Sequence, residues 1–400
     1  MGKLIEITLS DYIDILTDYH SGGSYKTLKE KTKILHNPDY AVMVRTLNFE
    51  SNDFINNLIY CDKDSYDFLE YSHIKENDVL MNKIANPGSV YIMPKVEYRA
   101  TCAMNLFLLR FKGINQRYMY YVMKNSEQYI KNQAHGTTTK TITKDEVRNL
   151  KFYIHENKEE RDRIAELLSS IDYKIDNNNK INLELESMAK TLFDYWFVQY
   201  EYQVPTGTYK SSGGKIRFLE EIGKDVPESW EIISLGELIS EAAKSPVQVN
   251  EAREHHGSIP FFTSGNEIIL FDKKFVDGFN IFLNTGGNAD IKAYKGAAAY
   301  STDTWCISAG EYSYYIYMYM LSIKECMDQL FFSGSGLQHL QKDVFKNQLI
   351  VKPDISVIRE YNRIVEDVFE KISHNKIENQ ELIELKEYIL PLLMNGQIEI

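Results

Sequence analysis

The sequence IAELLSSIDYKIDNNNKINLELESMAKTLFDYW, residues 164–196, shares its apolar spacing with YNRIVEDVFEKISHNKIENQELIELKEYILPLL, residues 361–393. In both stretches the mostly apolar positions follow alternating steps of four and three, which place them on one narrow stripe of a helix, the seam of a coiled coil. Each helix therefore requires a partner helix, and the other stretch can supply it. The first seam consists of Ile164, Leu168, Ile171, Ile175, Asn178, Asn182, Leu185, Ala189, Leu192 and Trp196, and the second of Tyr361, Val365, Val368, Ile372, Asn375, Asn379, Leu382, Lys386, Ile389 and Leu393.

Asparagines interrupt both seams at matching positions, Asn178 and Asn182 in the first and Asn375 and Asn379 in the second. If the helices run antiparallel about a pseudo-twofold axis, Asn178 meets the layer of Asn379 and Asn182 meets that of Asn375. A buried polar residue at a seam position costs stability and fixes the register. The alternative is that the asparagines mark a loop between shorter helices, but the heptad phase continues unbroken on both sides. A 33-residue seam would be about 49 Å long at about 1.5 Å per residue.

The duplication extends upstream of the seams. Residues 136–145 match residues 334–343 at an offset of 198, and each segment follows a tyrosine- and methionine-rich stretch of helical character, residues 115–133 and 312–330. Residues 78–82 and 280–284 are short apolar runs typical of buried strands. The predicted fold is therefore α+β, with two mixed α/β domains, each followed by a long helix, and an antiparallel coiled coil of pseudo-twofold symmetry. The predicted boundaries are 1–157 for the first domain, 158–198 for its helix, 199–225 for an exposed linker, 226–354 for the second domain and 355–400 for its helix.

The composition indicates a soluble intracellular protein, and we expect it in the cytoplasm. The chain is 26% charged and 44% hydrophobic, with no apolar run long enough to cross a membrane and no signal-peptide pattern. Its four cysteines form no CxxC pair and its nine histidines form no HExxH pattern, so neither a disulfide framework nor a metal site is predicted.

A search for catalytic motifs gives no positive case for chemistry. Residues 37–40, Asn-Pro-Asp-Tyr, resemble the loop with which amino-methyltransferases hold an extruded base, but Asp39 replaces the second proline and no glycine-rich loop follows a strand. A plain turn accounts better for this segment. The glycine clusters at 212–215 and 284–288 lack the spacing of a phosphate-binding loop. We therefore predict no catalytic residue in this chain.

Charge is distributed unevenly along the chain. The net charge is −12, yet residues 95–151 contain 11 Lys or Arg against 4 Asp or Glu. A nucleic-acid binder needs a basic surface rather than a basic total. A solvated charged face has the same composition, so charge alone leaves the two interpretations open.

Short motifs recur in a fixed order along nearly the whole chain. They are His135-Gly136-Thr137-Thr138, Glu159-Glu160-Arg161, Arg163-Ile164-Ala165, Leu167-Leu168, Met188-Ala189 and Trp196-Phe197 in the first half, and Val226-Pro227, Trp230, Leu235-Gly236, Ile259-Pro260-Phe261, Thr263-Ser264-Gly265 and Leu392-Leu393 in the second. In their order and duplication they resemble the specificity subunit of Type I restriction-modification systems. The second loop departs from the pattern, because Ser335, Gly336 and Leu337 replace the threonines.

The resemblance implies a non-catalytic subunit with two target recognition domains, each of which reads one half of a bipartite double-stranded DNA site. It further implies two methyltransferase (modification) subunits docked on the helices and motor or endonuclease (restriction) subunits as partners. S-adenosylmethionine, ATP and Mg would be bound by those partners, and no cofactor by this chain. Two dissimilar domains on a long spacer predict an asymmetric target with an unread gap, since the seam is longer than one 34 Å turn of DNA.

The expected DNA contacts are polar or small residues in and near the repeated loops. For each of them a capped turn or an ordinary exposed position is the alternative. The main candidates are Thr137, Thr138, Thr139 and Lys140 in the first domain and Ser335, Gln338 and His339 in the second, with Lys83, Arg99, Asn266, Asn288 and Lys292 as weaker candidates.

Other functional classes remain as alternatives. A coiled-coil scaffold for proteins would show no salt-sensitive affinity for DNA. A self-sufficient DNA methyltransferase would bind S-adenosylmethionine as a single chain, and its activity would depend on Asp39. A DNA-mimic inhibitor would spread carboxylates over its whole surface, which this sequence does not.

Overall fold

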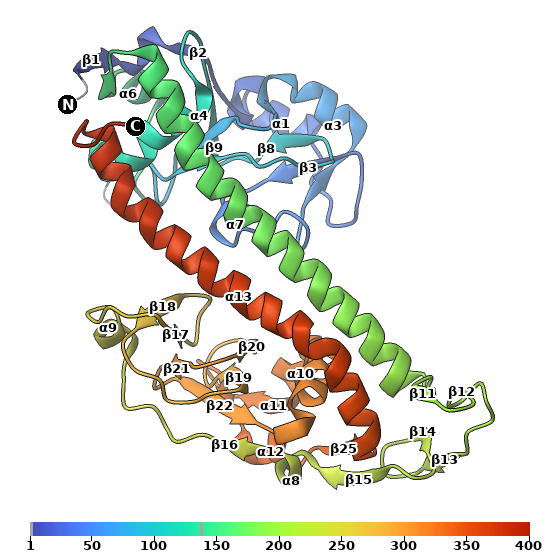
Figure 1. Ribbon diagram of the computed structural model, residues 1–400. Coiled ribbons are helices and arrows are strands. Elements are labelled where there is room, and N and C mark those ends of the chain that lie inside the picture. The colour runs from blue at the N-terminus through green and yellow to red at the C-terminus, as the bar shows by residue number, and fades with distance from the viewer. Residues whose placement is uncertain (1–2, 137–138) are drawn as a thin grey trace. The chain divides into compact units, whose positions relative to one another are not determined.

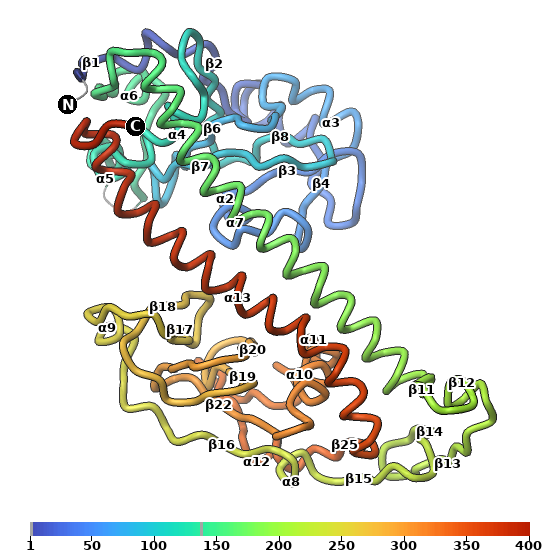
Figure 2. The backbone as a smooth tube through the Cα atoms, viewed as in Figure 1, coloured from blue at the N-terminus to red at the C-terminus, as the bar shows by residue number. Residues whose placement is uncertain are grey.

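The computed structural model describes residues 3–136 and 139–400 and separates into two units. Unit 1 comprises Met1–Tyr173 together with Glu384–Ile400, and unit 2 comprises Lys174–Ile383. Each unit combines a globular part with segments of the two long helices, α7 (Lys158–Phe193) and α13 (Ile355–Met394) (Figures 1 and 2). The last segment of α13 therefore belongs to the same unit as the first segment of α7.

Unit 1 is built around a four-stranded antiparallel sheet with buried central strands. Alternate residues serve two cores, because Val79 and Met81 pack with the tyrosines and methionines of α4 whereas Leu80 packs against a second sheet. Asn115 caps α4 by accepting hydrogen bonds from the amides of the first turn, which fixes where this helix begins. In sheet order the strands are β2 (Ile13–Asp18), β9 (Leu106–Phe111), β6 (Val79–Asn82) and β7 (Val90–Ile92), and α4 (Gln116–Asn125) is followed by α5 (Glu127–Gln133).

The second sheet of unit 1 is mixed, because its central strands β3 and β8 run parallel. A separate antiparallel ribbon joins β1 to β10, the strand that leads into α7. The second sheet has the order β4 (Tyr60–Cys61), β3 (Ala41–Val44), β8 (Ala100–Cys102) and β5 (His73–Ile74); the ribbon is β1 (Leu4–Thr8) and β10 (Lys151–His155); the short helices are α1 (Tyr25–Lys31), α2 (Thr46–Glu50), α3 (Lys63–Phe68) and α6 (Lys144–Arg148).

Unit 2 has the same arrangement of sheets and helices as unit 1. Its four-stranded antiparallel sheet is again followed by two helices, its second sheet again contains a parallel pair, and an antiparallel ribbon leads into α13. The first sheet is β16 (Ser240–Glu241), β22 (Thr304–Ser308), β19 (Phe279–Asn284) and β20 (Ile291–Lys295); the second is β18 (Ile268–Phe271), β17 (Ile259–Phe262) and β21 (Ala299–Tyr300); the ribbon is β15 (Glu231–Ser234) and β25 (Leu349–Lys352); the helices are α8 (Leu235–Leu238), α9 (Val249–Ala252), α10 (Ser313–Ser322), α11 (Lys324–Phe331) and α12 (Lys342–Lys346).

The two mixed domains, each followed by a long helix, confirm the predicted fold class. The apolar runs at 78–82 and 280–284 form the buried strands β6 and β19, and the tyrosine- and methionine-rich stretches form α4 with α5 and α10 with α11. The duplication visible in the sequence is thus a duplication of complete folding units.

The two long helices pair through the heptad seam. Every one of its twenty positions is buried or half-buried, and none is exposed. In unit 1 the seam position Lys386 forms an ion pair with Asp172 of α7, whose other carboxylate oxygen accepts a hydrogen bond of 2.6 Å from the hydroxyl of Tyr121 in α4. The single charged seam residue is therefore neutralised where the helix pair meets the globular part.

Asparagine layers join the helices in unit 2. The side-chain amide of Asn178 donates to Oδ1 of Asn379 at 2.9 Å, and that of Asn375 donates to Oδ1 of Asn182 at 2.8 Å. These contacts join the same layers that the sequence pairs for antiparallel helices. Glu378 accepts a further hydrogen bond of 2.7 Å from Asn178, which extends the first of these two layers beyond the seam.

Residues 199–225, suggested by the sequence as an exposed linker, contain two β-hairpins. The rings of Tyr200 and Tyr202 lie 5.6 and 5.4 Å from the ring of Trp230 and are buried against it. Aromatic packing therefore fixes the start of this segment, while most of its other residues are exposed. The hairpins are β11 (Gln203–Val204) with β12 (Gly207–Thr208) and β13 (Ile216–Leu219) with β14 (Lys224–Pro227).

We predict that Asn182→Ala destabilises the protein by about 1–3 kcal/mol, because the fully buried Asn375 loses the acceptor of its amide. Chemical denaturation would measure the loss. The paired change Asn182→Leu with Asn375→Leu removes both polar groups and should recover most of the stability. A single variant as stable as the wild type would contradict the assigned role of this layer.

Candidate nucleic-acid interface

The repeated loop of unit 1, residues 135–141, is a hairpin closed by its own backbone. His135 and Thr141 exchange hydrogen bonds of 2.9 and 2.8 Å. The same hairpin is bound to the loop that follows β6, since the amide of Ala85 donates to the carbonyl of Lys140 at 3.0 Å and the amide of Ile142 donates to that of Lys83 at 3.1 Å. Residues 83–88 are therefore held beside the described residues of the repeated loop, 135–136 and 139–141, and together we call them the loop pair of unit 1.

Unit 2 has a loop pair of the same construction. Its hairpin is formed by β23 (Phe332–Ser333) and β24 (His339–Leu340). The amide of Gly287 donates to the carbonyl of Gln338 at 2.9 Å, and the amide of Leu340 donates to that of Thr285 at 3.1 Å. Residues 285–289 and 333–339 are thus joined by the same two backbone contacts, although their side chains differ from those of unit 1.

A glycine at the same position shapes both hairpins. Gly136 has a φ of 117° and Gly334 a φ of 153°, and a Cβ at either position would lie 2.4 Å from the carbonyl oxygen of Thr139 or Leu337. Only a residue without a side chain fits so close an approach. The glycines that align in sequence therefore set the narrow form of the two hairpins.

The structure exposes most of the main candidates for DNA contact. Thr139 and Lys140 are exposed in unit 1, as are Ser335, Gln338 and His339 in unit 2. Thr137 and Thr138 lie outside the described residues. The main candidates that are described thus lie on the two hairpins, where their side chains are accessible to a ligand.

Lys83, one of the weaker candidates for DNA contact, is not at the surface. Its side chain is 8% exposed, and its ammonium lies 2.5 Å from a carboxylate oxygen of Asp18 and 3.1 Å from Nδ1 of His20. Burial alone would raise the pKa of Asp18, but hydrogen bonds from Lys144 and Lys83 lower it to about 2. The side chain of Lys83 pairs with Asp18, and its backbone carbonyl accepts a hydrogen bond from the amide of Ile142. Lys83 therefore holds the loop pair together.

The other weaker candidates differ in how exposed their side chains are. Arg99 is exposed and stacks on the ring of Tyr40 at 4.6 Å, beside the turn that contains Asp39. Asn266 and Asn288 are exposed at loop tips. By contrast, the ammonium of Lys292 donates to the carbonyls of the turn at residues 263–265 and forms an ion pair of 3.1 Å with Asp290.

Two lysines lie beside the loop pairs. Lys144 belongs to the basic stretch at residues 95–151, some of whose side chains could neutralise phosphates, whereas Lys342 was not among the candidates. Lys144 is the first residue of α6 and Lys342 the first residue of α12, and each directly follows its hairpin. The matching Lys-Asp pairs at 144–145 and 342–343 were a usable signal, because they fall inside the repeated segment. The sequence could not show that both lysines face a carboxylate from the edge of the first sheet.

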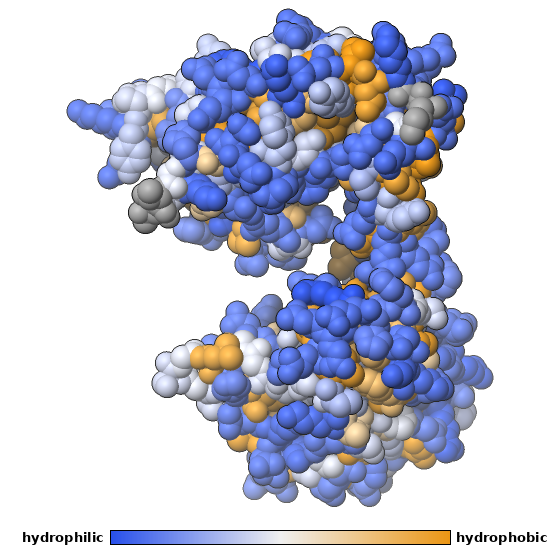
Figure 3. Space-filling view, turned by 90° about the vertical axis from the view of Figure 1, so that its left-hand side faces the viewer, coloured by the Kyte–Doolittle hydropathy of each residue, from blue (hydrophilic) through white to orange (hydrophobic). Residues whose placement is uncertain are grey.

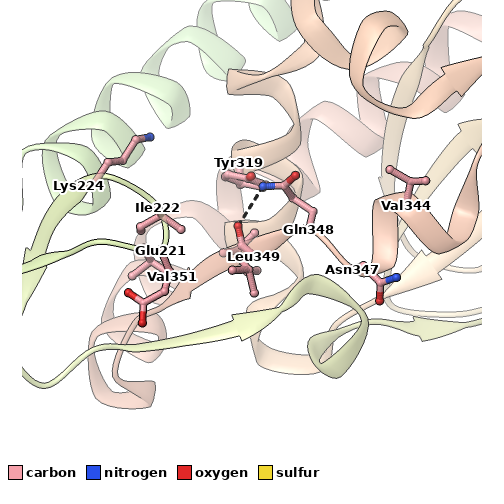
Figure 4. A pocket seen from close by; sticks show the side chains of 10 residues that line it. Glu221, Ile222, Lys224, Tyr319, Val344, Asn347, Gln348, Leu349 and Val351 are labelled. Atoms are coloured by element: carbon pink, nitrogen blue, oxygen red, sulfur yellow. Dashed lines mark hydrogen bonds between the residues drawn. The ribbon is translucent and has the colours of Figure 1, made fainter.

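A pocket of about 650 Å³ lies in unit 2 beside α12 and β25 (Figure 4). Apolar groups such as Tyr319 and Val351 share its walls with Glu221, Lys224 and the side-chain amide of Gln348. None of its lining residues belongs to the loop pair. The face shown in Figure 3 is mainly hydrophilic with scattered apolar side chains.

Searches of the described residues for other kinds of site give two findings. No group of three or more His, Cys, Asp or Glu side chains is arranged to hold a metal ion. No helix in the described part of the chain is long and apolar enough to cross a membrane.

Comparison with known proteins identifies the class. The family described as "Type I restriction modification DNA specificity domain" matches twice, at residues 14–187 and 227–387, and so covers both units. The chain is 24% identical over 315 residues to the MjaIX specificity subunit of Methanocaldococcus jannaschii, covering 72% of this chain and 70% of that protein. It is 22% identical over 405 residues to the HindI specificity subunit of Haemophilus influenzae, covering 81% and 87%.

A solved structure has the same fold. The S subunit of the Type I restriction-modification system of M. genitalium superimposes with a TM-score of 0.58 at 16% sequence identity, over 98% of this chain and 96% of that one. The duplicated domains and their paired helices are therefore shared across a wide sequence distance. This chain belongs to the family of Type I restriction-modification specificity subunits, the non-catalytic components that recognise the DNA target.

We predict that Gly136→Ala opens the unit 1 hairpin, because the new Cβ would collide with the carbonyl of Thr139. Hydrogen exchange should become faster at Thr141 and Ile142, while the melting temperature of the chain falls by only a few degrees. Gly113→Ala is the matched control, since Gly113 has a φ of 71° but open space around its Cβ position. Equal exchange in the two variants would show that the close approach does not shape the hairpin.

We predict that Asp18→Asn destabilises unit 1 at pH 7 by about 2 kcal/mol, because it leaves the buried Lys83 unpaired. The pKa of Asp18 is lowered, so its contribution is present above pH 4 and is lost as the pH falls from about 4 to about 2. Denaturation midpoints measured across this range should fall less steeply in the variant. Parallel pH profiles would contradict the charge pairing.

Proposed function

We propose that this specificity subunit reads an asymmetric, bipartite site in double-stranded DNA, with the loop pair of each unit at one half-site. The observation that carries the proposal is the repetition of one backbone frame with different side chains. Gly136 and Gly334 keep the frame the same, whereas Lys140 in one hairpin corresponds to Gln338 in the other. Two readers of one construction but different surface chemistry suit two different half-sites.

Exposed polar side chains on narrow hairpins suit contact with DNA. Hydroxyl, amide and ammonium groups donate to phosphate oxygens or to base edges, and small neighbours allow the backbone to approach the groove. The predicted seam of about 49 Å is longer than one turn of DNA. We therefore expect a gap between the half-sites that the protein does not read.

The proposal includes two modification subunits, one on each long helix. Both helices expose apolar residues at the heptad position just before a seam layer: Leu167 and Met188 on α7, and Ile364 and Leu385 on α13. Each residue has its counterpart 197 positions away, so the two helices offer equivalent faces. These partners would bring S-adenosylmethionine, and restriction subunits that use ATP and Mg would complete a complex that acts on DNA in the cytoplasm.

We predict that Met188→Glu or Leu385→Glu alone removes one modification subunit from the complex, because a charge on the exposed apolar face opposes docking. The mass of the purified complex should fall by one subunit for each variant and by two for the double variant. Lys190→Gln, an exposed change about 200° round α7 from Met188, is the control and should leave the mass unchanged. Intact complexes from both single variants would place the docking face elsewhere.

The test of the whole proposal is co-expression with a cognate modification subunit, followed by sequencing of methylated adenines in DNA exposed to the complex. We expect methylation at one asymmetric bipartite motif, lost when this chain is omitted. Exchange of residues 1–155 for those of a relative should change one half of the motif only. Methylation that does not change after the exchange would overturn the assignment of a half-site to unit 1.

A further inference from the structure

A lysine occupies the same place beside the loop pair of each unit. Lys144 begins α6 and Lys342, 198 residues later, begins α12. In both units its ammonium faces a carboxylate of the edge strand of the four-stranded sheet, Asp18 at the end of β2 or Glu241 at the end of β16. The duplication has thus kept a lysine and a carboxylate together next to each hairpin.

In unit 1 the carboxylate of Asp18 is shared by two lysines. The ammonium of Lys144 lies 2.7 Å from one oxygen of Asp18 and donates to the hydroxyl of Ser21 at 2.8 Å, while Lys83 takes the other oxygen. One buried carboxylate thus faces two positive charges. The side chain of Lys144 is 30% exposed, and an ammonium has three N–H donors, so Lys144 keeps a donor for a ligand at the surface.

In unit 2 the carboxylate of Glu241 is engaged by other groups before Lys342 reaches it. Lys346 pairs with one oxygen at 3.0 Å, and the indole of Trp305 donates to the other at 2.8 Å. The ammonium of Lys342 lies 3.8 Å from Glu241 and 4.8 Å from the centre of the Trp305 ring, and its side chain is 41% exposed. Lys342 is therefore positioned by the carboxylate and the indole without being neutralised by them.

A partly exposed lysine makes both places suited to an anionic ligand. In unit 1 two lysines face the one carboxylate of Asp18. In unit 2 two lysines face Glu241, and one of them, Lys346, also pairs with Asp343 at 3.6 Å. Burial lowers the pKa of Lys342, Glu241 opposes this, and the charges of Lys346 and Lys244 lower it further. A phosphate bound beside Lys342 would relieve that repulsion. In unit 2 a bound anion would therefore stabilise the charged form of Lys342.

We propose that Lys144 and Lys342 are phosphate-contacting residues, one in each unit, which Asp18 and Glu241 hold beside the loop pairs. The inference rests on the proposed function and adds residues to it. Phosphate contacts fix the position of a protein on the duplex but carry no sequence information. The two lysines would accordingly set how each hairpin meets its groove and contribute affinity that does not depend on the bases.

The test uses the complex of this chain with its modification subunits and the variants Lys144→Gln and Lys342→Gln. Both should fold, since Asp18 keeps Lys83, and Glu241 keeps Lys346 and Trp305. Affinity is measured against salt concentration on the target duplex and on a scrambled duplex. Each variant should lower the slope of log affinity against log salt by about 0.9 on both duplexes, with the methylated motif unchanged.

Control variants distinguish the loss of a phosphate contact from a loss of folding stability. Lys144→Arg and Lys342→Arg keep the charge and should keep the slope. Lys63→Gln and Lys274→Gln remove exposed lysines that pair within their own segments, and should leave the slope unchanged. Unchanged slopes in the Lys144 and Lys342 variants, or a loss of affinity that is equal at every salt concentration with a lower melting temperature, would overturn the inference. A wild-type complex that binds the target duplex no more tightly than the scrambled duplex would instead contradict the proposed function, and this inference with it.

Discussion

Antiparallel pairing of α7 with α13 brings together segments that are about two hundred residues apart in the chain. In unit 2 the pairing is fixed by asparagine layers, in which Asn178 bonds Asn379 and Asn182 bonds Asn375. A buried amide tolerates little displacement, because each lost hydrogen bond leaves a polar group unsatisfied in an apolar seam. In unit 1 the charged seam residue Lys386 has the same effect through Asp172. The pairing explains why the end of the chain belongs to the unit that contains its beginning.

The loop pair is a second constraint, and it is made of backbone. Two backbone hydrogen bonds join each hairpin to the loop after the central strand, and a glycine allows the hairpin to close. Because backbone atoms and one glycine define the frame, the remaining side chains are free to differ. A reader of DNA needs this separation, since the frame must stay rigid while the groups that meet the bases vary from one half-site to the other.

The net charge of the chain is a poor guide to what its surface can bind. An overall charge of −12 argues against DNA binding, yet a partly exposed lysine lies beside each hairpin. The interaction that matters is local, because exposed charges farther apart than about 10 Å are largely screened at ordinary salt. Lys83 illustrates the converse, since a lysine at the edge of the loop pair is buried under it and serves Asp18 instead of a ligand.

The duplicated α+β plan, the long helices and the positions of the repeated loops could be predicted from the sequence, because periodicity and repetition are visible along the chain. The pairing of the asparagines could also be predicted for antiparallel helices, since polar residues at matching seam positions fix the register. Only the tertiary structure decided which side chains of the loop region are exposed. Lys83 and Lys292 turned inward because carboxylates and carbonyls from distant segments meet them there. Tyr200 and Tyr202 are buried in the segment 199–225 because Trp230 gives them a surface to pack on. Such contacts join segments that are far apart in the sequence, so no local sequence pattern predicts them.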